Sequence, residues 1–180
     1  LTGSQRTISL EVHESSDGKT FVPAGKARIL AASPKDEGIN FLFLIDNSLS
    51  MYWDMAGKPT ESSEDTRASA AKRAAREFLL SMTSSRDQVG MASFNTRYEL
   101  LMSPTRDLDA SGPAMDRIVK PVPDDGYTEL YGGIVLASRD LGTSVGRRAL
   151  VVLSDGENFP WFKKRGSPSP IFGEKDWQSE

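Results

Sequence analysis

The chain has 180 residues, of which 38% are hydrophobic and 26% charged, and its formal net charge is −3. This length suits one domain with a core of its own, and the nearly balanced charge, without a basic block, argues against nucleic acid as a partner. The absence of cysteine excludes disulfides, thiolate metal ligands and thiol nucleophiles. No apolar run approaches the roughly 20 residues of a membrane span, so no membrane insertion is expected in this segment.

The first 38 residues are predicted to form a small β element in front of the main domain. The stretches "RTISLEVHES" (6–15) and "KARILAAS" (26–33) alternate in the manner of strands, and the turn-rich "SDGKTFVPAG" separates them. The main domain then covers residues 39–180.

From Ile39 onward the pattern changes to strands and helices. The run "INFLFLI" (39–45) is continuously apolar, as in a strand covered on both faces. Small and apolar residues then recur at intervals of three and four between 65 and 83, which predicts an amphipathic helix. The stretch "QVGMASF" (88–94) is the next strand, and "RYELLMS" (97–103) follows closely enough to be its antiparallel hairpin partner.

The second half continues this alternation. A short helix is predicted over 113–120, and a longer one begins at Leu130 and extends to Leu141. The stretch "RALVVLS" (148–154) is a third buried strand. This order predicts an α/β fold with an open, mostly parallel, doubly wound (Rossmann-like) sheet and helices on both faces.

The C-terminal end breaks the pattern. After Asp155 come 25 residues with three prolines and no clear helix or strand, where a doubly wound domain would continue. We therefore expect the C-terminal part of the domain to be truncated, or a further polypeptide to complete the sheet beside 148–154.

Polar side chains stand where the predicted strands end. Asp46, Ser48 and Ser50 follow the first strand of the main domain, Asp155 follows the last, and Thr128 precedes a helix. Ligands of open α/β sheets bind at the carboxyl ends of the strands, so these oxygens are expected to converge. Two carboxylates and three hydroxyls suit a hard divalent cation such as Mg²⁺.

Helix capping is the alternative for the same residues. The helix after Asp46 is expected to start near Ser62 or Ser63, which is too far for the first group to cap it. Thr128 can cap the helix that follows it, and Asp155 can be a plain turn acid.

Three motifs carry a resemblance to a known family. "IDNSLSM" resembles the D-x-S-x-S motif of von Willebrand factor type A domains, "GYTELYGGI" resembles their G-G-T-x-L-Y-x-x-I segment, and "LVVLSDGEN" is similar to their L-T-D-G-E-x motif. They occur in the family's order over about residues 39–158. In the family they form the metal-ion-dependent adhesion site. The sequence resembles the exported bacterial members of the family.

The resemblance implies a role for each site residue. Ser48 and Ser50 would coordinate the ion directly and Asp46 through water, while Thr128 would do either and Asp155 would act through water. The ion would be Mg²⁺, Mn²⁺ or Ca²⁺, and its remaining position would take an Asp or Glu of a protein partner. The resemblance thus implies a non-enzymatic binding module for adhesion, assembly or signalling, in the periplasm or at the cell surface.

Large side chains in the loops at this edge are predicted to contact the partner. The position between the serines is Leu49, where the family very often has glycine, so its side chain either shields the metal or demands a different backbone geometry. The alternative for the aromatic residues is that they pack on one another and close the top of the domain. The residues predicted to contact a partner are Leu49, Met51, Tyr52, Trp53, Trp161 and Phe162.

Two other functions remain open. A Mg²⁺-dependent phosphoryl-transfer hydrolase would use Asp46 as its nucleophile, but Ser48 stands where such enzymes usually carry a second acid. His13 is the only histidine, which argues against a hydrolytic triad. A metal-free scaffold that recognises partners through its loop aromatics is the third function.

Overall fold

The chain divides into two compact units, Leu1–Glu37 and Gly38–Glu180. The computed structural model describes residues 5–14, 22–32, 38–82, 84–144, 146–156 and 158–160.

The first unit contains an antiparallel pair of strands. Strand β1 (Gln5–Glu14) pairs with β2 (Val22–Ala32), and the register shifts between Val12 and His13 as in a β-bulge. The small β element predicted from the alternating sequence is therefore present.

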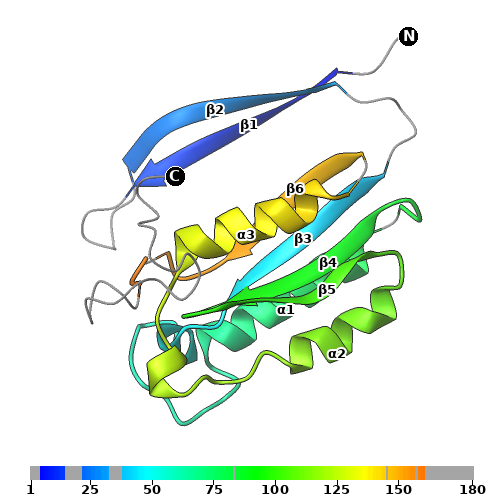
Figure 1. The fold of residues 1–180 in the computed structure, drawn as a ribbon. Helices are drawn as coiled ribbons and strands as arrows, with labels where there is room; N and C mark the ends of the chain where they lie inside the picture. The colour runs from blue at the N-terminus through cyan, green and yellow to red at the C-terminus, as the bar shows by residue number, and fades with distance from the viewer. Residues whose placement is uncertain are drawn as a thin grey trace. The chain divides into compact units, whose positions relative to one another are not determined.

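The second unit is built on a four-stranded sheet in the order β5-β4-β3-β6 (Figure 1). Its central strand β3 (Ile39–Asp46) runs parallel to β4 (Gln88–Phe94) and to β6 (Arg147–Leu153). Strand β5 (Tyr98–Thr105) pairs antiparallel with β4, as the short connection between them predicts. The open, mostly parallel sheet is confirmed.

Helices cover both faces of this sheet (Figure 1). Helices α1 (Arg67–Ser81) and α2 (Ser111–Asp116) share a buried cluster on one face, whereas α3 (Leu130–Gly142) packs on the other. None of the described helices is long and apolar enough to cross a membrane. Three short 3-10 turns complete the described elements: η1 (Leu49–Tyr52), η2 (Leu108–Ala110) and η3 (Pro123–Asp125).

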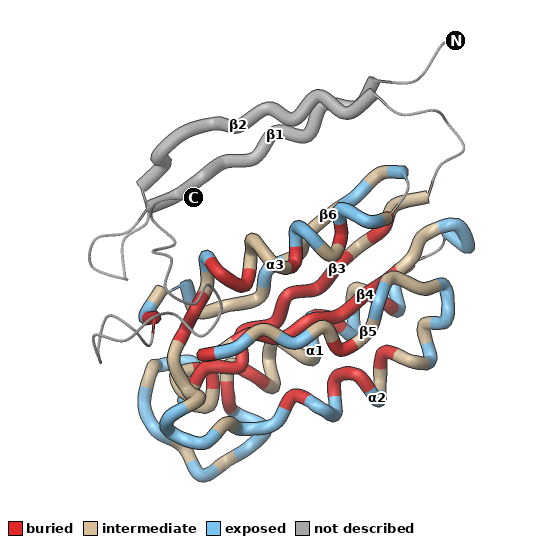
Figure 2. The backbone as a smooth tube through the Cα atoms, in the orientation of Figure 1, coloured by how far each residue is buried: buried red, intermediate tan, exposed pale blue. Residues whose placement is uncertain are grey.

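The sequence of β3 is continuously apolar because successive side chains point to opposite faces of the sheet and both faces are buried. Phe43 and Ile45 point into the cluster under α1 and α2, and Leu42 and Leu44 point into the cluster under α3. All four side chains are at most 1% exposed, and β3 and β4 lie in the buried middle of the sheet (Figure 2). The strand that leads to Asp46 is thus fixed from both sides.

Two predicted helix boundaries are wrong. Helix α1 starts at Arg67 and not near Ser62 or Ser63, because Thr66 is its N-cap and accepts a hydrogen bond from the Ser69 amide at 3.1 Å. The segment before it is bridged to Asp54 through Thr66, which keeps that segment out of the helix.

The second wrong boundary concerns the helix predicted over 113–120, which is α2 at Ser111–Asp116. Pro113 is tolerated in its first turn, so the helix begins before it. Lys120 precedes Pro121, and a residue before proline is disfavoured in helical conformation. The chain therefore leaves the helix earlier than its apolar spacing indicates.

Candidate metal site

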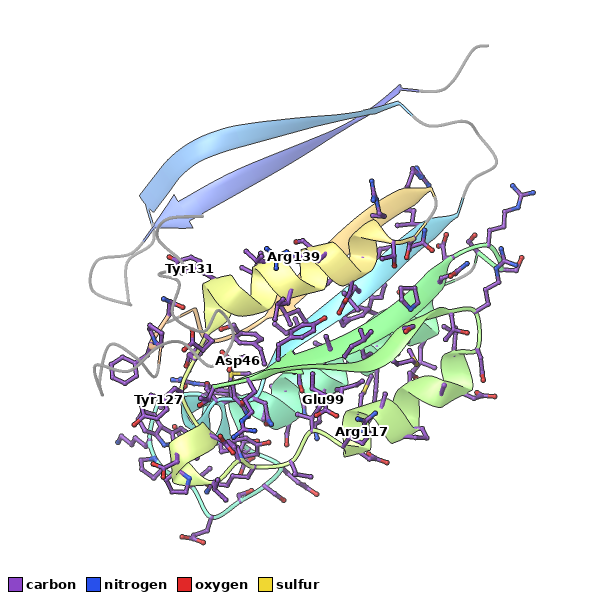
Figure 3. All side chains as sticks on the ribbon, viewed as in Figure 1. Asp46, Glu99, Arg117, Tyr127, Tyr131 and Arg139 are labelled. Carbon is purple, nitrogen blue, oxygen red and sulfur yellow. The ribbon has the colours of Figure 1, made fainter. Side chains whose placement is uncertain are left out.

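Asp46 ends β3 and is fully buried among the loops at the carboxyl edge (Figure 3). Its Oδ1 accepts a hydrogen bond from the Ser48 amide at 2.8 Å, and its Oδ2 accepts one from the Ser154 hydroxyl at 2.7 Å. Burial raises the pKa of Asp46 above 3.8, and the bonds from Ser154 and Ser48 partly counter this rise, while the charge of Asp155 adds to it. The carboxylate is held rigidly at a place where its charge is poorly solvated.

The two serines of the first motif present their hydroxyls together. The Oγ atoms of Ser48 and Ser50 lie 3.1 Å apart, and Ser48 is fully buried. Ser48 precedes η1, yet its side chain makes no capping hydrogen bond. The capping alternative therefore does not explain why a hydroxyl stands at this position.

Backbone hydrogen bonds to two other segments hold the Thr128 segment at this edge of the sheet. It forms an isolated antiparallel bridge with Phe159, with N–H to carbonyl distances of 2.9 and 3.0 Å. Two residues earlier, the carbonyl of Gly126 accepts from the Leu49 amide at 3.0 Å, which ties this segment to the serine loop. The N-cap of α3 is Glu129, so Thr128 is not the cap residue.

Asp155 follows β6 and has one oxygen engaged and one left over. Its Oδ2 accepts from the Arg67 guanidinium Nη1 at 2.7 Å. Its Oδ1 is buried and has no hydrogen-bond partner in the part of the chain that the structure describes. A buried polar atom without a partner is unfavourable by about 1–3 kcal/mol, and more when charged, so this oxygen is suited to receive a ligand.

The donor set fits a hard divalent cation. Within the described ranges, no three His, Cys, Asp or Glu side chains gather in a group that could hold a metal. The candidate site has a different composition, namely two carboxylates and three hydroxyls, and Mg²⁺ accepts such oxygen donors together with water. The unpartnered Oδ1 of Asp155 is the observation of this structure that favours a ligand there.

The order and placement of these loops agree with a family match. The profile of the von Willebrand factor type A domain matches residues 41–157, which is well over half of the chain. The chain belongs to the von Willebrand factor type A domain family. No curated protein matches it.

Solved structures share the fold of this type A domain. The PilB minor pilin from Streptococcus sanguinis is 17% identical with a TM-score of 0.56, and the match covers 84% of this chain and 43% of the pilin. For the vWF domain of the type V pili tip protein Mfa5 from Porphyromonas gingivalis, the identity is 18%, the TM-score 0.52 and the coverage 71% and 40%. An aerotolerance-related membrane protein from Bacteroides fragilis is 26% identical with a TM-score of 0.54, and the match covers 67% and 56%. The chain spans about half the length of these proteins.

The side chain of Leu49 in this type A domain lies directly against Gly126. A Cβ placed on Gly126 would lie 2.3 Å from the Leu49 Cγ and 2.5 Å from its Cδ1. The half-buried leucine thus occupies the space that a side chain at 126 would need. The larger residue between the two serines is accommodated because the facing position is glycine.

The other residues predicted to contact a partner have different surroundings. Met51 is only 2% exposed and belongs to the core, so it does not face a partner in this structure. The Tyr52 hydroxyl donates to Asn47 Oδ1 at 2.7 Å, which fixes the ring inside the loop. Trp53 is 41% exposed and remains accessible. Trp161 and Phe162 lie outside the described residues.

Sequence reasoning missed three residues that support the site. Ser154 holds Asp46, Arg67 binds Asp155, and Phe159 bridges Thr128. Ser154 lies inside the third motif, directly before Asp155, so its place at a strand end was a usable signal. The pairing of Arg67 with a residue 88 positions away had no local signal.

The burial of Asp46 also bears on the enzyme alternative. A nucleophile must reach its substrate, whereas both oxygens of Asp46 are engaged by the protein and the side chain is 0% exposed. This arrangement suits a carboxylate that is fixed by hydrogen bonds from Ser48 and Ser154 and interacts with an ion indirectly.

Proposed function

We propose that this type A domain binds a divalent cation, Mg²⁺, Mn²⁺ or Ca²⁺, and captures an acidic side chain of a protein partner through that ion. Ser48, Ser50 and Thr128 would supply hydroxyl ligands. Asp46 and Asp155 would interact with the ion through water and not coordinate it directly. The unpartnered buried oxygen of Asp155 is the observation that carries the proposal, and the charge of Asp155 also acts on the buried carboxylate of Asp46.

The hydrogen bonds of Asp46 give a physical reason for capturing an acid. Both of its oxygens are already engaged, by Ser48 and Ser154, so the carboxylate is held back by the protein. Neutral hydroxyls as direct ligands leave a divalent ion under-neutralised in a site of low solvation. Such an ion attracts a carboxylate from outside the domain.

Apolar side chains beside the site favour a protein as the source of this carboxylate. Trp53 is 41% exposed, and its amide donates to the Ser50 carbonyl at 3.1 Å. On the Thr128 side, Phe159 is 45% exposed and stacks on Tyr127 with the ring centroids 6.0 Å apart. Exposed aromatic residues around a charged centre are typical anchors of protein interfaces.

The biological setting is part of the proposal. We place the domain outside the cytoplasm, in the periplasm or at the cell surface, in adhesion, assembly or signalling. The support is that structures of similar fold include a minor pilin and a pilus tip protein.

Calorimetric titration of the metal-stripped chain with Mg²⁺ and Mn²⁺ tests the metal. Asp46→Asn and Ser48→Ala are expected to abolish saturable binding, while Ser103→Ala, an exposed serine of β5, keeps it. Asparagine is preferred to alanine because it retains an oxygen for the Ser48 amide and a polar atom for Ser154. Absence of binding by folded wild-type protein would reject the metal and favour a metal-free scaffold.

A second titration tests the capture of an acid. The apparent Mn²⁺ affinity is measured with a peptide that carries one central glutamate and with the same peptide carrying glutamine. Linkage requires that a ligand of the ion tightens Mn²⁺ binding, so only the glutamate peptide is expected to do so. Equal effects of the two peptides would reject capture through the ion.

A further inference from the structure

The guanidinium of Arg67 forms an ion pair with Asp155 of the candidate metal site. Arg67 donates from Nη1 to Asp155 Oδ2 at 2.7 Å, and the two side chains are only 24% and 12% exposed. The pair of Arg76 and Asp116 on the same helix is different, with 55% and 77% exposure and a 3.7 Å separation. The Arg67 pair is therefore screened much less by solvent.

Arg67 stands at an unfavourable place for a cation unless an anion faces it. It is the first residue of α1, where the helix dipole is positive, and the first turn contains no acidic residue. Asp155 supplies the missing negative charge from a distant loop.

Further contacts fix the arginine in this orientation. Its amide donates to the Trp53 carbonyl at 3.1 Å. A Cβ at Gly57 would lie 2.9 Å from its Nη2, and Gly57 has a φ of +78°, so the loop passes closely over the guanidinium. Both ends of Arg67 are thus positioned by the loop that precedes α1.

We propose that Arg67 sets the charge of the metal site: it competes with the cation for Asp155 and leaves the loaded site with a net positive charge. The inference rests on the proposed function. Asp46 and Asp155 contribute two negative charges and Arg67 one positive, so a divalent ion brings the sum to plus one; without Arg67 the sum is zero. Arg67 therefore lowers the affinity of the site for the ion. It also strengthens the attraction of the bound ion for a partner's carboxylate.

The test is a Mn²⁺ titration of the metal-stripped full chain, together with its melting temperature with and without Mn²⁺. Arg67→Gln is expected to tighten Mn²⁺ binding by about tenfold, because it removes a repulsive charge and frees Asp155. It is also expected to lower the melting temperature of the metal-free protein, since Asp155 loses its counter-charge, and Mn²⁺ should restore most of that loss. Arg67→Lys keeps the charge and should stay close to wild type, as should the matched control Arg76→Gln.

The outcomes separate this inference from the proposed function. Wild-type binding with an unchanged or weaker affinity in Arg67→Gln would overturn the role of Arg67 and leave the metal site standing. Equal tightening by lysine and glutamine would also overturn it, because charge would then not be the cause. Absence of Mn²⁺ binding by wild type and by Arg67→Gln alike would overturn both proposals.

Discussion

The contact between Leu49 and Gly126 leads to a prediction about the stability of the serine loop. A Cβ at position 126 would meet the Leu49 Cγ at 2.3 Å, Cδ1 at 2.5 Å and Cβ at 3.2 Å. Carbon atoms pack best at about 3.5–4.0 Å, so the leucine side chain would have to move by more than about 1 Å. Rotation about its side-chain torsions relieves the contacts to Cγ and Cδ1 but leaves the tight contact to Cβ.

The expected effect of Gly126→Ala follows from these distances. Gly126 has φ −91° and ψ 14°, which alanine adopts readily, so backbone strain is not involved. Overpacking of this kind is unfavourable by about 1–3 kcal/mol. The smaller entropy of the unfolded alanine variant offsets about 0.4–1 kcal/mol of this, so we expect a net loss of about 1–2 kcal/mol of unfolding free energy.

A double-mutant cycle measured by urea unfolding checks this reasoning. Leu49→Ala removes the obstructing atoms, so Gly126→Ala should be nearly neutral in that background, with a coupling energy of at least about 1 kcal/mol. The Mn²⁺ affinity should fall in Gly126→Ala and recover in the double variant, because the leucine sits between the two serines of the site. Additive changes in unfolding free energy would refute the contact as the cause.

Three further predictions concern neighbouring contacts. Ser154→Ala removes the donor to Asp46 Oδ2 and should lower the free energy of unfolding by about 1–3 kcal/mol in urea titrations; no change would contradict the importance of that bond. Burial raises the pKa of Tyr52 from 10.0 to about 12, so the folded state holds this proton more tightly: the stabilisation is complete below pH 10 and is lost as the pH rises toward 12. Tyr52→Phe should flatten that decline in unfolding free energy, and an unaltered decline would argue against the shift. Gly133→Ala should destabilise α3 packing, since its Cβ would lie 2.9 Å from the Phe94 Cγ, and a gain in melting temperature would show that the ring moves freely.

The sequence predicted the strands and the helix that carry the candidate site residues. Strand β3 could be recognised because both of its faces are apolar, and parallel pairing then places Asp46 and Asp155 at one edge of the sheet. Thr128 could be included because it opens the segment before α3. These inferences rest on periodicity and topology, which a single sequence expresses directly.

The remaining features depend on contacts between distant segments. Met51 and Trp53 are both large and lie two positions apart, yet one is buried and the other is 41% exposed. Nothing local distinguishes them, because the packing of a loop is decided by what covers it. The partner of Arg67 was likewise set by the closeness of α1 to the end of β6, and not by its neighbours in sequence.

The position of β3 in the middle of the sheet has a mechanical consequence. Strand β3 is paired in parallel over its length with β4 on one side and with β6 on the other, so we consider a partner held at its end that pulls along its axis. A force in that direction loads both ladders in shear, so many hydrogen bonds must yield together and not one after another. The proposed attachment point therefore lies at the end of a strand that both neighbouring strands hold against such a pull.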